Sequence, residues 1–79
     1  MAVEFSENKA IFKNTVTIEE AEAVFEWLLR EKDVEVDMIE CEHIHTSVFQ
    51  ILAIFKPKIL LPKDEELKKW IELLGGQDV

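Results

Sequence analysis

Cysteine, glycine and proline are scarce in this sequence, and tyrosine is absent. One cysteine cannot form a disulfide within the chain, which excludes a disulfide-stapled fold and fits a reducing compartment. No glycine-rich phosphate-binding loop and no nucleophile elbow occur among the 79 residues, which include only 2 glycines. Enzymes that depend on either of those two motifs are therefore excluded.

Basic residues are also few. Lys and Arg number 9 against 17 Asp and Glu, which gives a formal net charge of -8. This charge repels nucleic-acid phosphates and anionic lipid headgroups, so we expect neither nucleic acid nor a membrane surface as a partner. No apolar run approaches the roughly 20 residues that span a bilayer, and residues 1–8 show no basic start or apolar core of a signal peptide. We therefore expect a cytoplasmic protein without membrane insertion.

The residues that are present have the composition of a folded domain. Hydrophobic residues make up 48% of the chain and charged residues 33%, which separates it from disordered sequences. The length suits a single domain over residues 1–79. A domain of this size buries only about 60% of the surface of its unfolded chain, so we expect a thin core.

The segment from Val34 to Met38 has the clearest strand pattern. Its apolar residues alternate with Glu35 and Asp37. Such alternation is typical of a strand with one packed face and one solvated face, whereas a strand covered on both faces is apolar throughout. We therefore expect the helices to lie mainly on one face of the sheet.

Further elements are predicted on both sides of this strand. A capping box at Thr17 and Glu20 predicts the start of a helix. The remaining elements are a hairpin of strands at residues 2–5 and 10–13, a second helix at 46–55, a strand at 59–61 and a last helix at 62–74, closed by Gly75 and Gly76. The order strand, strand, helix, strand, helix, strand, helix predicts an α/β sandwich with a mixed four-stranded sheet.

Apolar residues at helical spacing predict which side of each helix is buried. In the first helix the predicted stripe is Ala21, Val24, Phe25 and Leu28, with Trp27 flanking it at the edge of the core. In the last helix it is Leu67, Trp70, Ile71 and Leu74. The predicted core comprises Val24, Leu28, Val36, Met38, Ile51, Leu52, Phe55, Ile71 and Leu74.

The helix predicted at residues 46–55 is apolar almost all round. Gln50 is the only polar residue in its body, and Thr46 and Ser47 at its start are expected to provide the N-terminal cap. A helix of this kind is either buried on all sides or docks a partner, and a small domain cannot bury it completely. We therefore expect Phe49 and Ala53 to contribute to a partner surface.

The stretch before this helix is predicted to be a polar turn, and it contains Cys41, His43 and His45. If it were extended, the three side chains would lie on one side and could bind zinc or copper, with Glu40 or Glu42 as a fourth ligand. The alternative is that Cys41 packs in the core and the histidines stay in the turn. We favour this alternative and expect no metal and no cofactor. No set of nucleophile, base and orienting group is evident, so we expect no enzymatic activity.

Four phrases of the sequence resemble the STAS family, the fold of the anti-sigma-factor antagonists. They are VTIEEAEAVFEWLL, VEVDMIECEHIHTS, VFQILAIF and LPKDEELKKWIELLG. Together with the order of the elements, the resemblance extends over nearly the whole chain. The resemblance implies a protein-interaction domain without enzymatic activity. It places Thr46 at a position that a partner kinase phosphorylates, with Ser47 next to it, whereas His45 stands where the family usually has Asp.

The resemblance also implies the kind of partner. The leading hypothesis is a regulatory module that binds an anti-sigma-type serine kinase or phosphatase and is switched by phosphorylation at Thr46 or Ser47. The alternative is a constitutive subunit of another complex, such as one with a transporter ATPase, and the histidine at position 45 favours it. In both cases the predicted partner surface comprises His45, Thr46, Ser47, Phe49 and Gln50.

Overall fold

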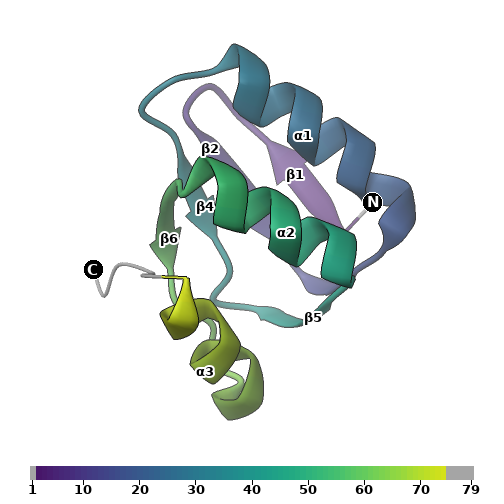
Figure 1. Cartoon of the computed structure of the whole chain (residues 1–79), viewed down its shortest axis with the longest axis vertical. Coiled ribbons are helices and arrows are strands. Elements are labelled where there is room, and N and C mark those ends of the chain that lie inside the picture. The colour runs from purple at the N-terminus through teal and green to yellow at the C-terminus, as the bar shows by residue number, and fades with distance from the viewer. Residues whose placement is uncertain (1, 75–79) are drawn as a thin grey trace.

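The computed structural model describes residues 2–74 (Figure 1). Its strands are β1 (Val3–Phe5), β2 (Lys9–Phe12), β3 (Asn14–Val16), β4 (Glu35–Asp37), β5 (Cys41–Ile44) and β6 (Lys58–Leu60). Its helices are the short 3-10 helix η1 (Ile18–Glu20), α1 (Ala21–Arg30), α2 (Thr46–Phe55) and α3 (Glu65–Leu73). The predicted C-cap at Gly75 and Gly76 lies outside the described residues.

The central sheet has four strands in the order β1-β2-β4-β6. β1 and β2 form the predicted antiparallel hairpin, and β4 runs parallel to both β2 and β6, so the sheet is mixed as predicted. Ala10, Val36 and Ile59 lie side by side across three strands, and all three are buried. Helices α1 and α2 cover this face, and α3 lies beyond the C-terminal end of β6 (Figure 1).

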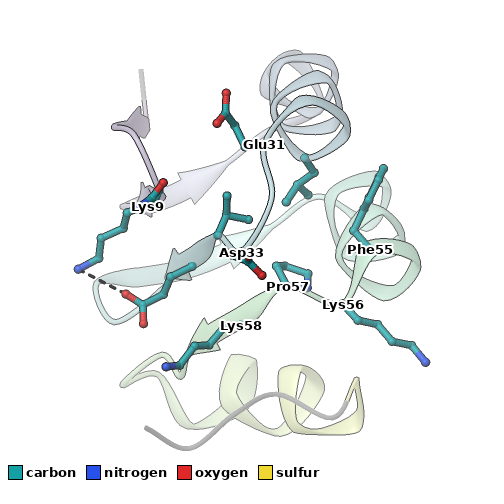
Figure 2. Close-up of a pocket in the computed structure, with 11 residues that line it drawn as sticks. Lys9, Glu31, Asp33, Phe55, Lys56, Pro57 and Lys58 are labelled. Carbon is teal, nitrogen blue, oxygen red and sulfur yellow. Dashed lines mark ion pairs between the residues drawn. The ribbon is translucent and has the colours of Figure 1, made fainter.

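The opposite face of the sheet carries charged residues. Lys9, Glu35 and Lys58 lie side by side one position before the buried row, and side chains alternate between the two faces of a sheet. The ammonium of Lys9 is 3.7 Å from a carboxylate oxygen of Glu35, an ion pair drawn in Figure 2. Exposed ion pairs of this kind contribute about 0–1 kcal/mol to stability. The alternation in residues 34–38 therefore identified the solvated face correctly.

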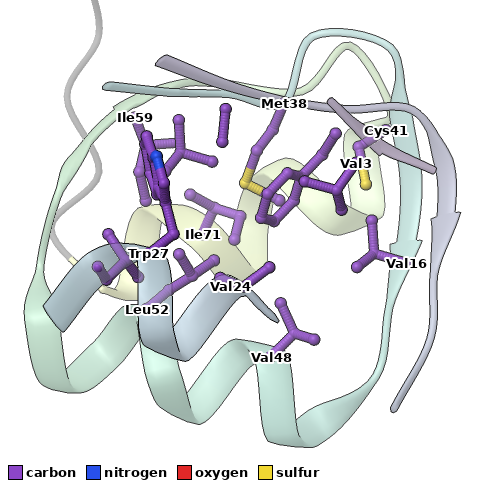
Figure 3. Packing of buried hydrophobic residues seen from close by; sticks show 14 of the residues in the cluster. Val3, Val16, Val24, Trp27, Met38, Cys41, Val48, Leu52, Ile59 and Ile71 are labelled. Carbon is purple, nitrogen blue, oxygen red and sulfur yellow. The ribbon is translucent and has the colours of Figure 1, made fainter. Parts of the chain in front are cut away.

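The core lies between the sheet and the helices (Figure 3). Six of the predicted core residues are buried, namely Val24, Leu28, Val36, Met38, Leu52 and Ile71. The other three, Ile51, Phe55 and Leu74, are only partly buried and pack against the edge of this cluster. The prediction is thus confirmed for these six residues and was too generous for the other three.

The prediction for the aromatic residues of α1 was wrong. Trp27 is only 3% exposed, whereas Phe25 is 39% exposed. The ring of Trp27 packs on Phe5 of β1 at a centroid distance of 5.3 Å, and the ring of Phe25 meets Phe55 of α2 at 5.6 Å. A stripe with Phe25 and a stripe with Trp27 both contain Val24, and both fit helical spacing. The packing of Trp27 on β1 decides between them, and local periodicity does not reveal this contact.

The capping box at the start of the first helix is present as predicted. One carboxylate oxygen of Glu20 accepts hydrogen bonds from the amide and the hydroxyl of Thr17 at 2.9 and 3.1 Å. The other oxygen accepts from the amide of Ala2 at 2.8 Å and so ties the N-terminal strand to the helix. Burial alone would raise the pKa of Glu20, but these hydrogen bonds outweigh it and lower the pKa.

A second, two-stranded sheet was not predicted. Residues 41–44, expected to form a polar turn, are strand β5, which pairs in parallel with β3. His43 is aligned with Thr15 and Ile44 with Val16. Both strands are short and rich in polar residues, so the hydrophobic pattern that reveals a strand is missing here. This pair directs the chain from the core strand β4 into the start of α2.

Candidate functional site

His45 caps the N-terminus of α2, and this corrects the prediction that Thr46 or Ser47 does so. The helix begins at Thr46, and the Nδ1 atom of His45 accepts a hydrogen bond from the amide of Ser47 at 3.0 Å. The first amides of a helix have no partner within it, and any nearby acceptor can satisfy them. The imidazole thus makes the hydrogen bond that the carboxylate of an aspartate would make at this position.

The two hydroxyl groups at this helix start are not equivalent. Since the amide of Ser47 donates to Nδ1 of His45, that nitrogen carries no proton. The hydroxyl of Ser47, 2.8 Å from the same nitrogen, therefore also donates to it. Thr46 is exposed, and its side chain makes no hydrogen bond within residues 2–74. Of the two predicted phosphoacceptors, Thr46 is the accessible one.

A cavity of about 300 Å³ lies between α2 and α3, beside β5. Its apolar lining residues are Ile44, Phe49, Leu67 and Trp70. Its polar lining residues are Glu42, His43, Thr46 and Glu66. Pockets of this kind, mostly apolar with a few polar groups, are typical of binding sites. The cavity places Thr46 and Phe49, two of the predicted partner-binding residues, in one concave site.

Phe49 and Trp70 form the aromatic wall of this cavity. Their ring centroids are 6.2 Å apart and the ring planes are at 88°, the edge-to-face arrangement that aromatic pairs favour. Trp70 is 55% exposed, so its predicted place in the buried stripe of the last helix was wrong. α3 turns Leu67 and Ile71 toward the core instead. Trp70 therefore lies against α2 and partly covers Phe49.

The remaining predicted partner residues lie outside the cavity. Gln50 is exposed on the outer side of α2, and Ala53 is half-buried. One helical turn after Gln50, Ile54 is 71% exposed and belongs to no wall of this cavity. The first turns of α2 therefore present two surfaces, one concave beside α3 and one convex toward solvent.

Sequence reasoning missed Trp70 and the two carboxylates of Glu42 and Glu66 as members of the site. A local signal for two of them was present, because residues four apart share one face of a helix. Glu66 and Trp70 have this spacing, on a face different from that of the buried Leu67 and Ile71. That this face meets α2 depends on packing between segments far apart in the sequence.

The structure does not bring Cys41, His43 and His45 together. Cys41 is 1% exposed, whereas both histidines are exposed, and within residues 2–74 no three His, Cys, Asp or Glu side chains are grouped as metal ligands. The thiol of Cys41 donates a hydrogen bond to the carbonyl of His43 at 3.5 Å. Burial raises the pKa of this thiol to about 11, and the carboxylates of Glu42 and Asp64 act in the same direction.

A larger cavity of about 720 Å³ lies at the other end of the molecule, where β4 and β6 begin (Figure 2). Three lysines and three carboxylates line it. The side chain of Lys56 points to the opposite side from those of Lys9 and Lys58, and Lys9 is already paired with Glu35. Because its charged groups diverge, this cavity offers no single recognisable ligand chemistry.

Comparison with models of protein families, with curated proteins and with solved structures finds no match to this chain. The similarity to the STAS family thus stays a prediction from the residues quoted above. No helix formed by residues 2–74 has both the length and the apolar character to cross a membrane.

The cap can be tested by substituting His45. His45→Ala removes the acceptor for the amide of Ser47 and should lower the free energy of unfolding by about 0.5–2 kcal/mol. His45→Asp supplies a carboxylate acceptor instead and should restore most of that loss. Denaturant-induced unfolding of the three proteins measures the difference. Equal losses in both variants would show that the imidazole does not act as a cap.

The burial of Cys41 predicts a dependence of stability on alkaline pH. The folded pKa of about 11 lies above the ordinary thiol value, so the unfolded chain loses this proton first. The contribution of the thiol to stability is complete below that ordinary value and should be lost as the pH rises toward 11. The free energies of unfolding of the parent and of Cys41→Ala, measured at a series of pH values over this range, should converge as the pH rises. Parallel pH profiles would contradict the assignment.

Proposed function

We propose that this protein is a cytoplasmic, non-catalytic protein-interaction module similar to the anti-sigma-factor antagonists. Its partner docks on the start of α2 and in the cavity between α2 and α3. The observation that carries this proposal is the aromatic wall of Phe49 and Trp70, of which Trp70 is 55% exposed beside a concave, mostly apolar surface. Tryptophan is among the residues that contribute most to the affinity of protein interfaces.

The energetics favour a partner at this place. Each square ångström of apolar surface removed from water contributes about 25 cal/mol, and an aromatic side chain offers a large area with few rotatable bonds. Trp70 already has one side fixed by its contact with Phe49. Ordering this residue on binding therefore costs little conformational entropy.

A catalytic role for the contact between His45 and Ser47 is not supported by the site. A serine activated by histidine needs a third group that orients the imidazole. No hydrogen bond of the second ring nitrogen of His45 is found within residues 2–74, and Nδ1 already caps the helix. The pair serves to begin α2.

In the switched form of this function, a kinase partner phosphorylates Thr46. Its support is that the Thr46 hydroxyl is exposed and lies at a helix N-terminus, where the helix dipole favours an anion. A phosphate here would be tolerated by the free protein. A docked partner would have to desolvate it beside the apolar cavity, at a large cost in free energy. An anti-sigma-type serine kinase or phosphatase fits this form.

In the constitutive form, the module binds its partner without a switch. Its support is that Glu42 and Glu66 line the same cavity as Thr46. At a phosphate on Thr46, repulsion by both carboxylates would oppose the attraction of the helix N-terminus. In addition, His45 stands where the family has an aspartate. A subunit that binds a transporter ATPase or another fixed partner fits this form.

The proposal is tested by calorimetric titration of a partner recovered by pull-down. Phe49→Ala should weaken binding at least tenfold, about 1.4 kcal/mol, because it removes half of the aromatic wall. Ile54→Ala, which removes an exposed apolar side chain outside the cavity, is the matched control and should bind like the parent. If Ile54→Ala weakens binding and Phe49→Ala does not, the docking site has been misplaced.

The same titration separates the two forms. Thr46→Glu places a carboxylate where the phosphate would be, and melting curves should show the variant folded. In the switched form this substitution lowers the affinity for the partner at least tenfold. In the constitutive form the affinity is not lowered.

A further inference from the structure

We propose that the cavity between α2 and α3 binds the guanidinium group of an arginine side chain presented by a partner polypeptide. The inference rests on the proposed interaction function and names the chemistry of the partner. It follows from three properties of the cavity: its uncompensated carboxylates, its aromatic wall and its size.

The charge of the cavity is the first property. Glu42 and Glu66 line it, and among its lining residues there is no lysine or arginine. Within residues 2–74 neither glutamate takes part in an ion pair, whereas the nearby Glu40 is held by Lys63 at 3.1 Å. The whole chain carries a net charge of -8, which attracts cationic partners from a distance. A cation is therefore the complementary ligand.

The aromatic wall is the second property. A cation is attracted to the face of an aromatic ring, most strongly to that of tryptophan, and arginine makes such contacts more often than lysine. Trp70 is 55% exposed at the cavity and is held in place by Phe49 at 88° between ring planes. A guanidinium can stack on such a ring while its N–H groups still reach carboxylates in its own plane.

The size and the apolar floor are the third property. About 300 Å³ is at the small end of the range for ligand pockets, so the cavity suits one side chain better than a nucleotide-sized cofactor. Ile44 and Leu67 complete the lining with aliphatic surface. Arginine carries its charge on an apolar stem that packs on such surface.

Arginine fits better than lysine because its head group is planar and more weakly hydrated. It can also donate paired hydrogen bonds to a carboxylate, which an ammonium group cannot do in the same geometry. With arginine as the ligand, Thr46→Glu adds a third carboxylate to the cavity. A third carboxylate does not weaken the binding of a cation, whereas in the switched form Thr46→Glu lowers the affinity. The inference therefore agrees with the constitutive form of the function.

The experiment uses two small probes of nearly the same shape that differ in the charge and the hydrogen-bonding groups of the head group. They are acetyl-arginine methylamide and acetyl-citrulline methylamide, of which citrulline has a neutral urea group. Each is titrated into the full chain, and the indole N–H signals of the 2 tryptophans are followed by NMR. The arginine probe should shift the signal of Trp70 with an affinity of about millimolar. The signal of Trp27, which is 3% exposed, serves as the internal reference and should not move.

The expected result is at least tenfold weaker binding of the citrulline probe. Glu66→Gln should lower the affinity for the arginine probe severalfold and leave the affinity for the citrulline probe unchanged. Glu65→Gln, its exposed neighbour on α3 outside the cavity, is the matched control and should have no effect. Equal binding of the two probes, or no shift of Trp70 with arginine, would overturn the inference.

The outcomes also distinguish this inference from the function on which it rests. If the arginine probe does not bind and Phe49→Ala still lowers the affinity for the natural partner, the cavity binds a partner of different chemistry. If the arginine probe binds and Phe49→Ala leaves the affinity for the natural partner unchanged, the cavity recognises arginine. The proposal that the natural partner docks in this cavity is then wrong.

Discussion

The structure is organised by the apolar surface of α2. Its ten residues have Gln50 as the only polar side chain after the first turn, and a four-stranded sheet can cover only one side of such a helix. Val48 and Leu52 face the sheet and are fully buried. α1 covers a second side through Phe55, and α3 approaches the third through Phe49. The fourth side stays in water, where Ile54 is 71% exposed.

The candidate site is a consequence of how incompletely α3 covers this helix. α3 is anchored in the core by Leu67 and Ile71, and Trp70 contacts α2 through the ring of Phe49. The space between the helices becomes a cavity with aromatic and aliphatic walls. Acidic residues line it because β5 and the first turn of α3 carry Glu42 and Glu66. The same shortage of covering surface that limits the stability of a small domain thus creates the candidate site.

Local patterns predicted the parts of this structure that local interactions determine. Alternation in residues 34–38 gave the solvated face of the sheet, and the capping box gave the start of the first helix. The almost entirely apolar second helix led to the prediction of Thr46 and Phe49 as partner residues, and both line the cavity beside α3. The predicted environments of Trp27 and Trp70 were wrong, because several helical stripes fit the spacing and distant strands and helices select among them. The cap by His45 was missed because cap preferences favour hydroxyls and carboxylates over imidazoles.

The proposed function requires that the partner bind in the cavity beside Trp70 and not at another exposed aromatic surface. Photocrosslinking tests it most directly, with p-benzoylphenylalanine placed at position 70 or, as the comparison, at position 25. Both native side chains are exposed aromatic residues, at 55% and 39%, and they belong to different helices, α3 and α1. Irradiation in cells should join the protein to a partner from position 70, and Glu66→Gln should reduce the yield. Crosslinking from position 25 alone, or equally from both positions, would contradict the proposed function.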